Sequence, residues 1–175
     1  MGLTWPQLHE YPAGYAPYLA GASSEDGLTL LQRQLEEVDT LFAALSEAQG
    51  AFRYAPGKWS LKDLLQHVTD AERIFTYRCL RIGRGDATPL PGFDENAYAE
   101  AAQAEGRSLA ELRADWRAAR AAMLTLCQSL SDEAWAHQGT SNGKTLTARC
   151  IPFICLGHVA HHLAVIRERY LPGLR

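Results

Sequence analysis

The chain has 175 residues, of which 47% are hydrophobic and 21% charged, values typical of one globular domain rather than of a disordered or fibrous chain. We therefore take residues 1–175 as a single domain. The formal net charge of −3 argues against a nucleic-acid partner, because such domains usually carry a basic excess. Ala and Leu far outnumber the β-branched Val and Ile, which favours an all-α fold over a β-sandwich, a barrel or a Rossmann sheet.

The N-terminus has no basic start followed by an apolar run, so it does not predict a secretory signal. No uninterrupted apolar stretch approaches the roughly 18 residues of a membrane span, and we expect no membrane partner. The cysteines show no CxxC pair and no disulfide-framework spacing, which predicts reduced thiols and a cytoplasmic location. They are Cys79, Cys127, Cys150 and Cys155.

Residues 1–22 contain four aromatic side chains and several prolines without a helical period. We expect an ordered arm that packs these aromatic side chains onto the body of the protein. The first long helix is predicted to begin at the polar, acidic run 23–26 and to stop before Gly50. Its apolar stripe follows steps of three and four residues: Leu28, Leu31, Leu35, Val38, Phe42 and Leu45.

The second helix is predicted to run from Ser60 to about Gly83, because Ser60 and Asp63 have the spacing of a capping box. Its apolar stripe is Leu61, Leu64, Val68, Ala71 and Phe75. The linker 83–106 that follows is long for a compact domain, and such loops commonly have a function or a short element of their own. A short helix within residues 94–104 fits the pattern.

Ser108 and Glu111 have the same capping spacing at the start of the third helix. Its stripe is Leu109, Leu112, Trp116, Ala119, Met123, Leu126 and Leu130. A short turn is expected from Ser131, followed by a polar loop over residues 138–144.

The last helix is predicted to begin between Thr147 and Pro152, since proline is tolerated in a first helical turn, and to end near Tyr170. Long amphipathic helices in this number predict a four-helix bundle with an N-terminal arm and long connections between helices.

Two histidines interrupt the apolar stripe of the last helix, which reads Ile151, Cys155, His158, His162, Val165 and Arg169. Residues four apart stack on one helical face, about 6 Å apart, so both imidazoles could bind one ion. His67 lies beside the stripe of the second helix and could complete a set of three nitrogen ligands. Three neutral nitrogen ligands with one open position are what a catalytic divalent metal requires.

Other interpretations of these residues stay open. A lone histidine such as His67 is more often a hydrogen-bonded core or rim residue than a ligand. His161 is an alternative ligand, because residues three apart also share a face. Asp63 and Asp70 could orient His67 by hydrogen bonds, although a helix cap and a solvated face explain them equally well. The sequence contains no HExxH motif, no nucleophile elbow and no phosphate-binding glycine loop.

The chain resembles the DinB-like, YfiT-type metal-binding four-helix bundles of bacteria over roughly residues 24–170. The resemblance rests on Lys58-Trp59-Ser60-Leu61, on His67-Val68-Thr69-Asp70-Ala71-Glu72-Arg73, on Pro89-Leu90-Pro91-Gly92-Phe93-Asp94-Glu95-Asn96-Ala97-Tyr98 and on Gly157-His158-Val159-Ala160-His161-His162.

This resemblance implies one divalent metal ion held by His67, His158 and His162, with His161 as a flanking neighbour. It also implies a small-molecule substrate, because related families include S-transferases and isomerases that use low-molecular-weight thiols such as bacillithiol or mycothiol. Homodimers are common in the family. Nitrogen-rich sites accept Zn, Ni, Fe or Mn, so the sequence leaves the ion open.

We therefore expect a metal-dependent transferase or hydrolase that activates a small thiol or water. The alternative is a non-catalytic metal- or ligand-binding helical bundle linked to a stress response, whose ion would need a fourth protein ligand such as His161. The loops 83–106 and 138–144 are the expected mouth of the pocket. Candidate substrate contacts are Asp94, Glu95, Tyr98 and Trp116, with helix capping and core packing as their structural explanations.

Overall fold

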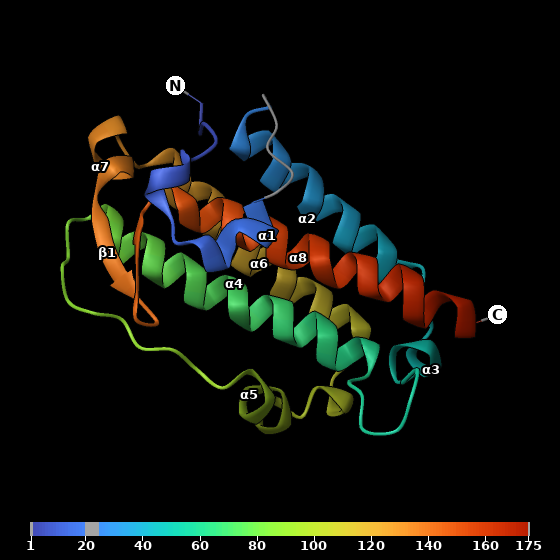
Figure 1. Ribbon diagram of the computed structural model, residues 1–175. Helices are drawn as coiled ribbons and strands as arrows, with labels where there is room; N and C mark the ends of the chain where they lie inside the picture. Colours follow the sequence, from blue (N-terminus) through green and yellow to red (C-terminus); the bar gives the residue numbers. More distant parts are fainter. Residues whose placement is uncertain (1, 20–24, 175) are drawn as a thin grey trace.

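The computed structural model describes residues 2–19 and 25–174. Four long helices form a bundle (Figure 1): α2 (Gly27–Ala43), α4 (Leu61–Gly83), α6 (Leu109–Gln128) and α8 (Cys150–Val165). The last of these continues into η4 (Ile166–Tyr170), which has π-helical hydrogen bonds, and η5 (Leu171–Leu174). The all-α prediction and the four-helix bundle are confirmed.

The last long helix, α8, packs against both α2 and α4. Helix α4 packs against α6 and α8, and α2 packs against the same two helices. Helices α2 and α4 therefore lie diagonally across the bundle, although they are consecutive long helices in the chain. This arrangement brings α4 and α8, which carry the candidate histidines, side by side (Figure 1).

The predicted caps fix where the long helices begin. Asp26, Ser60 and Ser108 each accept a hydrogen bond from a backbone N–H in the first turn of their helix, and the last two form complete capping boxes. Such a cap contributes about 1 kcal/mol. Helix α8 begins at Cys150, within the predicted window, and places Pro152 in its first turn.

Two buried apolar clusters hold the helices together, and each fully buried large side chain contributes roughly 1.5–3 kcal/mol. The first cluster, near the hairpin end, includes Leu31, Ile82, Met123, Trp135 and Phe153. The second, toward the C-terminal end of α8, includes Val38, Leu65, Leu112, Trp116 and Leu163.

The predicted end of the first helix is wrong. Helix α2 stops at Ala43, and a separate short helix, α3 (Glu47–Gly50), ends on Gly50. Ser46 restarts the helical path, because its hydroxyl accepts from the Gln49 N–H while the Gln49 side chain accepts from the Ser46 N–H. Leu45 therefore belongs to the connection and not to the α2 stripe. Leu130 likewise lies beyond the end of α6, although it is buried.

The predicted polar loop at 138–144 is also wrong, because these residues form a β-hairpin. Strands β1 (Gln138–Ser141) and β2 (Lys144–Thr147) pair antiparallel, with Gln138 opposite Thr147. Asn142 and Gly143 connect them with φ values of 51° and 71°, and Asn-Gly readily adopts the left-handed backbone that a two-residue hairpin turn needs.

The N-terminal arm is ordered over its described part, as expected, but it contains short helical turns that the sequence did not predict. These are η1 (Leu8–Glu10), η2 (Ala13–Tyr15) and α1 (Ala16–Leu19). The arm lies across α8 (Figure 1), and Trp5 packs on Phe153 with ring centroids 4.5 Å apart. The rest of the predicted arm, and the predicted helix start at Ser23 and Ser24, lie outside the described residues.

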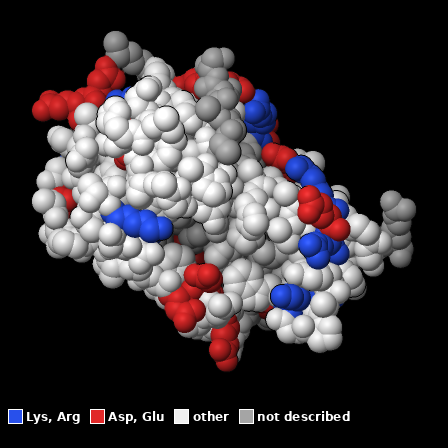
Figure 2. Space-filling view, viewed as in Figure 1, with Lys and Arg blue, Asp and Glu red and all other residues white. Residues whose placement is uncertain are grey.

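The long connections contain three more short helices: α5 (Glu95–Ala102), η3 (Ala104–Gly106) and α7 (Asp132–Ala136). The first confirms the helix expected in the 83–106 linker. Figure 2 shows Lys and Arg side chains dispersed among acidic ones on the face viewed, without one continuous basic stripe. Within the described part of the chain, Cys150–Leu174 passes for a membrane span by length and composition, yet 56% of its apolar window is buried in the bundle.

Candidate metal centre

Three histidines from two helices converge at the side of the bundle. The Nε2 atom of His158 lies 3.1 Å from Nε2 of His67, across the α4–α8 contact, and 3.1 Å from Nε2 of His162, one turn further along α8. The three potential ligand atoms all lie within 4.8 Å of one another. Nitrogen ligands about 2.0–2.1 Å from one zinc ion would be roughly 3.0–3.4 Å apart, so both contacts have the spacing of a shared ion.

Burial keeps these imidazoles neutral. It lowers the pKa of His67, and burial together with the neighbouring histidines lowers the pKa of His158 to about 3 and that of His162 to about 2. Neutral imidazole is the form that ligates a metal. At neutral pH the set therefore offers three nitrogen donors without any loss of protons.

Hydrogen bonds among the three rings cannot satisfy them. If Nε2 of His158 carries a proton, it can donate to one neighbour but cannot accept from the other. If it is unprotonated, its proton is on Nδ1, which is buried and has no hydrogen-bond partner among the described residues. Either tautomer leaves a polar atom unsatisfied, which is costly in a buried site. A cation at the centre would use all three Nε2 lone pairs, so the residues fit a metal ion.

The predicted stripe of the last helix holds only in its first half. Ile151 and Cys155 are buried, but Val165 is half-buried and Arg169 exposed. The buried residues of the second half are Val159, Leu163, Ile166 and Tyr170. The two histidines thus lie at the edge of the core, where they can contact a cavity as well as α4.

His161 lies outside the cluster. It is exposed, its ring centroid is 5.2 Å from that of His162, and it is not among the three grouped donors. It also lines a second hollow, of about 560 Å³ between the arm, α2 and α8, which none of the three clustered histidines lines. We therefore place the candidate site at a different, smaller cavity of about 360 Å³, which the three clustered histidines line.

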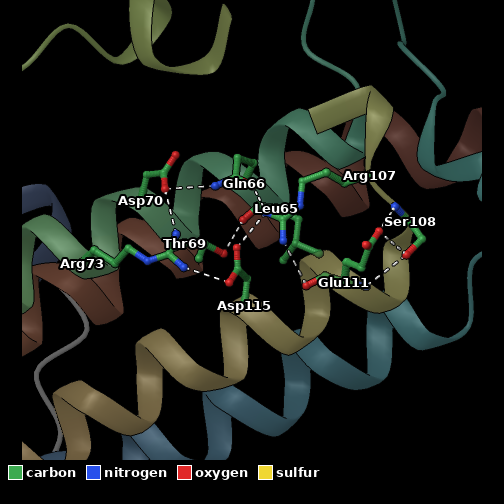
Figure 3. Close-up of polar contacts among 9 residues, drawn as sticks. All are labelled: Leu65, Gln66, Thr69, Asp70, Arg73, Arg107, Ser108, Glu111 and Asp115. Atoms are coloured by element: carbon green, nitrogen blue, oxygen red, sulfur yellow. Dashed lines mark hydrogen bonds and ion pairs between the residues drawn. The ribbon is translucent and has the colours of Figure 1, made fainter. Parts of the chain in front are cut away.

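Neither aspartate orients His67. Asp70 accepts hydrogen bonds from Gln66 and Arg73, and Arg73 also pairs with Asp115 of α6 (Figure 3). Asp63 caps α4 and pairs with Arg53. Of the explanations left open for these two residues, the helix cap and the contacts of a polar face are the ones observed in the described structure. The ring of Trp59 instead packs on His67, with centroids 4.8 Å apart.

A cavity of about 360 Å³ opens onto the histidines and lies between the arm, α4, α8 and the two predicted loops. It is lined by all three clustered histidines together with Tyr15, Tyr18, Trp59, Ala71, Phe75, Arg78, Phe93, Glu95, Asn142, Ile154 and His161. Phe93 comes from the 83–106 linker and Asn142 from the hairpin turn. The location of the mouth is therefore as predicted, and the volume suits a small molecule.

Of the four candidate substrate contacts, Glu95 alone lines this cavity. Asp94 caps α5, since its side chain accepts from the N–H groups of Asn96 and Ala97. Tyr98 is exposed and packs on Phe93. Trp116 has the structural role that its stripe position suggested, because its side chain is fully buried in the core, where its indole N–H donates to the Leu35 carbonyl.

The arm approaches the site through a glycine. A Cβ atom on Gly157 would lie 2.0 Å from the Tyr18 carbonyl oxygen, so only glycine permits this contact. The close approach holds the Tyr18 ring with its centroid 6.1 Å from that of the adjacent His158. Phe75 lies at the same centroid distance from His158. Aromatic side chains thus form much of the wall around the middle ligand.

Sequence reasoning missed most of this lining, including Tyr15, Tyr18 and Arg78. The arm residues gave no signal, because their place depends on how the arm crosses α8. Arg78 did give one: it continues the stripe Val68, Ala71 and Phe75 by another three residues, so a charged side chain stands on a core-facing position of α4.

The fold is shared with solved structures. YfiT from Bacillus subtilis, described as a probable metal-dependent hydrolase with an unusual four-helix bundle topology, matches with a TM-score of 0.71 and 19% identity, over 85% of this chain and 87% of that one. A mycothiol-dependent maleylpyruvate isomerase matches with a TM-score of 0.66 and 20% identity, over 78% of this chain. The match spans only 58% of the isomerase chain. At these identities the likeness establishes the fold alone.

No curated protein matches the chain. A family model does: the model of the DinB superfamily matches residues 30–166. This stretch contains all four bundle helices except the start of α2, and it includes His67, His158 and His162. The chain therefore belongs to the DinB superfamily.

Proposed function

We propose that the protein is a metal-dependent transferase or hydrolase that activates a small thiol or water for attack on a second small molecule. One observation carries the proposal: three neutral, converging imidazoles open onto a cavity of about 360 Å³. A structural metal site normally closes its fourth position with a protein ligand. Within the described part of the chain, the grouped donors number three, so the fourth position faces the cavity.

His67, His158 and His162 would hold one divalent ion. When bound, such an ion lowers the pKa of a water or thiol at the open position to near neutral. The Zn, Ni, Fe and Mn ions all accept imidazole ligands, and the proposal does not depend on which of them is native.

The chain's own residues supply orientation and a proton acceptor. Trp59, Tyr18 and Phe75 pack against the ligand rings and limit their rotation. Glu95 is exposed on the cavity, and its charge opposes the effect of burial on the pKa of His67. Its carboxylate is therefore near that ligand and is our candidate to accept the proton that the thiol or water releases.

Metal content is the first test. We expect purified, untagged protein to carry about one equivalent of a divalent ion by plasma mass spectrometry, and His158→Ala to carry almost none, because metal binding requires the full ligand set. His161→Ala is the matched control, because His161 directly precedes the proposed ligand His162 but lies outside the cluster. This variant should retain the ion. A wild-type protein that stays empty after incubation with Zn, Ni and Mn would contradict the proposal.

Activity is the second test. The metal-loaded protein would be assayed with a panel of small thiols against chlorodinitrobenzene and, separately, with nitrophenyl esters in the absence of thiol. We expect turnover in one assay, its loss in His158→Ala, and a decrease of about 100-fold or more in Glu95→Gln, the contribution usual for general base catalysis. Metal retention without turnover in either assay would favour the non-catalytic metal-binding bundle. We also propose that the protein forms a homodimer and that it is located in the cytoplasm.

A further inference from the structure

Arg78 is a buried cation that has no carboxylate partner among the described residues, and it lines the cavity of the candidate metal centre. Its side chain is on α4, three turns from His67, and the residue is 5% exposed. Its guanidinium lies 5.7 Å from the centroid of the Phe75 ring and 6.0 Å from that of Phe93. Nη2 donates to the Pro91 carbonyl oxygen at 2.8 Å. No ion pair joins Arg78 to any acidic side chain in residues 2–19 or 25–174.

Within the part of the chain that the structure describes, Arg78 uses little of its hydrogen-bonding capacity. A guanidinium has five N–H donors, and four of them form two edges, each with two parallel donors. Nη2 has one N–H on each edge, so a single bond from it leaves one complete edge free. Buried arginines are ordinarily paired, and a planar two-donor edge matches the two oxygens of a carboxylate.

We propose that Arg78 binds a carboxylate group of the substrate while the reacting thiol or water lies at the histidines. The inference rests on the proposed function for the position of the reacting group and adds a substrate class, namely small molecules that carry a carboxylate. Phe75 relates the two ends, because its ring centroid lies 5.7 Å from the Arg78 guanidinium and 6.1 Å from the His158 ring centroid. A small molecule in the cavity could therefore meet both groups.

The charges around the cavity agree with this assignment. The cavity lining includes the basic residue Arg78 and the acidic residue Glu95. The charge of Glu95 affects the pKa of His67, and it is not among the causes that shift the pKa of Arg78. Burial lowers the pKa of Arg78, and the neighbour that counters this effect is the Tyr15 hydroxyl, which is neutral at pH 7. Outside the lining, the Lys144 ammonium lies 4.7 Å from the Tyr15 ring centroid. Arg78 thus supplies the positive charge of the lining and Glu95 the negative one.

The test compares acidic thiols with neutral thiols of the same length. Mercaptobutyrate and mercaptohexanoate would be titrated against mercaptobutanol and mercaptohexanol, into both metal-free and zinc-loaded protein. The readout is the NMR signal of the Arg78 Nε–H group, assigned by its disappearance in Arg78→Lys. We expect the acids to shift this signal and the alcohols to leave it in place. In the zinc-loaded protein, at least one acid should bind about tenfold tighter than its alcohol, as one charge-assisted pair allows.

Substitution then identifies the residue. Arg78→Met should abolish the preference for acids while leaving the affinity for the alcohols unchanged, and Arg78→Lys, which keeps the charge without the planar edge, should reduce the preference severalfold. Arg81→Met is the control on the same helix, because Arg81 already pairs with Asp86; it should retain the full preference. Circular dichroism and the melting temperature of each variant would show that the fold is intact.

The outcomes separate this inference from the proposed function. An Arg78 signal that no acid moves in either form of the protein, or a preference that survives in Arg78→Met, would overturn the carboxylate assignment even if zinc and thiols bind. A protein that takes none of Zn, Ni and Mn would refute the proposed function, and a zinc-loaded protein that binds neither kind of thiol would refute its thiol-activating form. In that case the titration of the metal-free protein still decides the role of Arg78.

Discussion

The Glu72–Arg120 ion pair and the three clustered histidines both interrupt the apolar interior of the same bundle, and the first is satisfied by protein groups while the second is not. Arg120 donates to both carboxylate oxygens of Glu72, at 2.7 and 3.1 Å, and to the Leu31 carbonyl and the Gln34 side chain. Cys155 also donates to Glu72. Both charged side chains are fully buried.

The histidine cluster has no such closure. Its centre is three nitrogens facing one another, and Nδ1 of His158 is without a partner in the part of the chain that the structure describes. A buried polar group whose bonds are complete holds helices together, whereas one whose bonds are incomplete points to something that binds there. This difference separates a structural cluster from a candidate site only one to two turns away on α4 and α8.

The largest effect is expected at the satisfied cluster. Arg120→Met should lower the free energy of unfolding by about 3–5 kcal/mol, because Glu72 would remain buried without its cation. Urea denaturation measures the change. Arg117→Met, one turn earlier on α6 and half-exposed beside Asp39, is the control and should cost less than about 1 kcal/mol. An equal loss in both variants would remove the distinction between buried and surface pairs.

The converse is expected at the histidines. His158→Ala should weaken metal binding by at least about 100-fold, since even residues that support a ligand contribute 10–100-fold. The metal-free variant should be about as stable as metal-free wild type, because the substitution removes an unsatisfied polar atom along with its packing. Zinc competition titration and urea denaturation give the two numbers. A strongly destabilised metal-free variant would mean that the histidines are a packed structural cluster.

An intermediate effect is expected where the arm crosses α8. Gly157→Ala adds a methyl group against the Tyr18 backbone, and the arm must move away, at a cost of about 1–3 kcal/mol in unfolding free energy. In an unobstructed helix the same change would stabilise by up to about 1 kcal/mol. Thermal unfolding distinguishes the two signs, and a stabilised variant would show that the arm does not rest on Gly157.

The smallest change in stability is expected at the surface ion pairs that Asp39 of α2 forms with Arg113 and Arg117 of α6. Hydrogen bonding from Arg113 lowers the pKa of the Asp39 carboxyl below its ordinary value. Its contribution is therefore complete above about pH 4 and disappears as the pH falls through the lowered pKa. Asp39→Asn should cost about 0.5–1 kcal/mol at pH 7 and progressively less as the pH falls through the lowered pKa. A cost that persists in acid would show that charge is not its origin.

The sequence predicted the parts of the fold that local chemistry determines. The caps at Ser60 and Ser108 were predicted because each needs only two residues three positions apart in the sequence. Helices α4 and α6 start as expected. The hairpin carried an equally local signal, Asn142-Gly143, which the polar composition around it obscured. The break after Ala43 had a weaker one, because Ser46 and Gln49 form a capping box within what looked like the end of a helix.

The candidate site was predictable in its ligands and not in its walls. His158 and His162 stand out against an apolar period, and His67 was added by its position and by the family resemblance. Tyr15 and Tyr18 come from an arm whose path across α8 depends on long-range packing, which no spacing rule describes. Arg78 was visible by the reasoning that singled out His158, as a charge on an apolar stripe, yet its meaning depended on the absence of a partner in the described structure.

The most direct measurement of the central claim is the X-ray absorption spectrum of the zinc-loaded protein. We expect a spectrum dominated by imidazole scattering from three histidines, with Zn–N distances of about 2.0–2.1 Å and one further light ligand from solvent. His161→Ala should leave the spectrum unchanged and His158→Ala should remove an imidazole contribution together with most of the zinc. A spectrum with sulfur ligands, or with fewer than three imidazoles in the wild-type protein, would contradict the assignment of His67, His158 and His162 as the metal site.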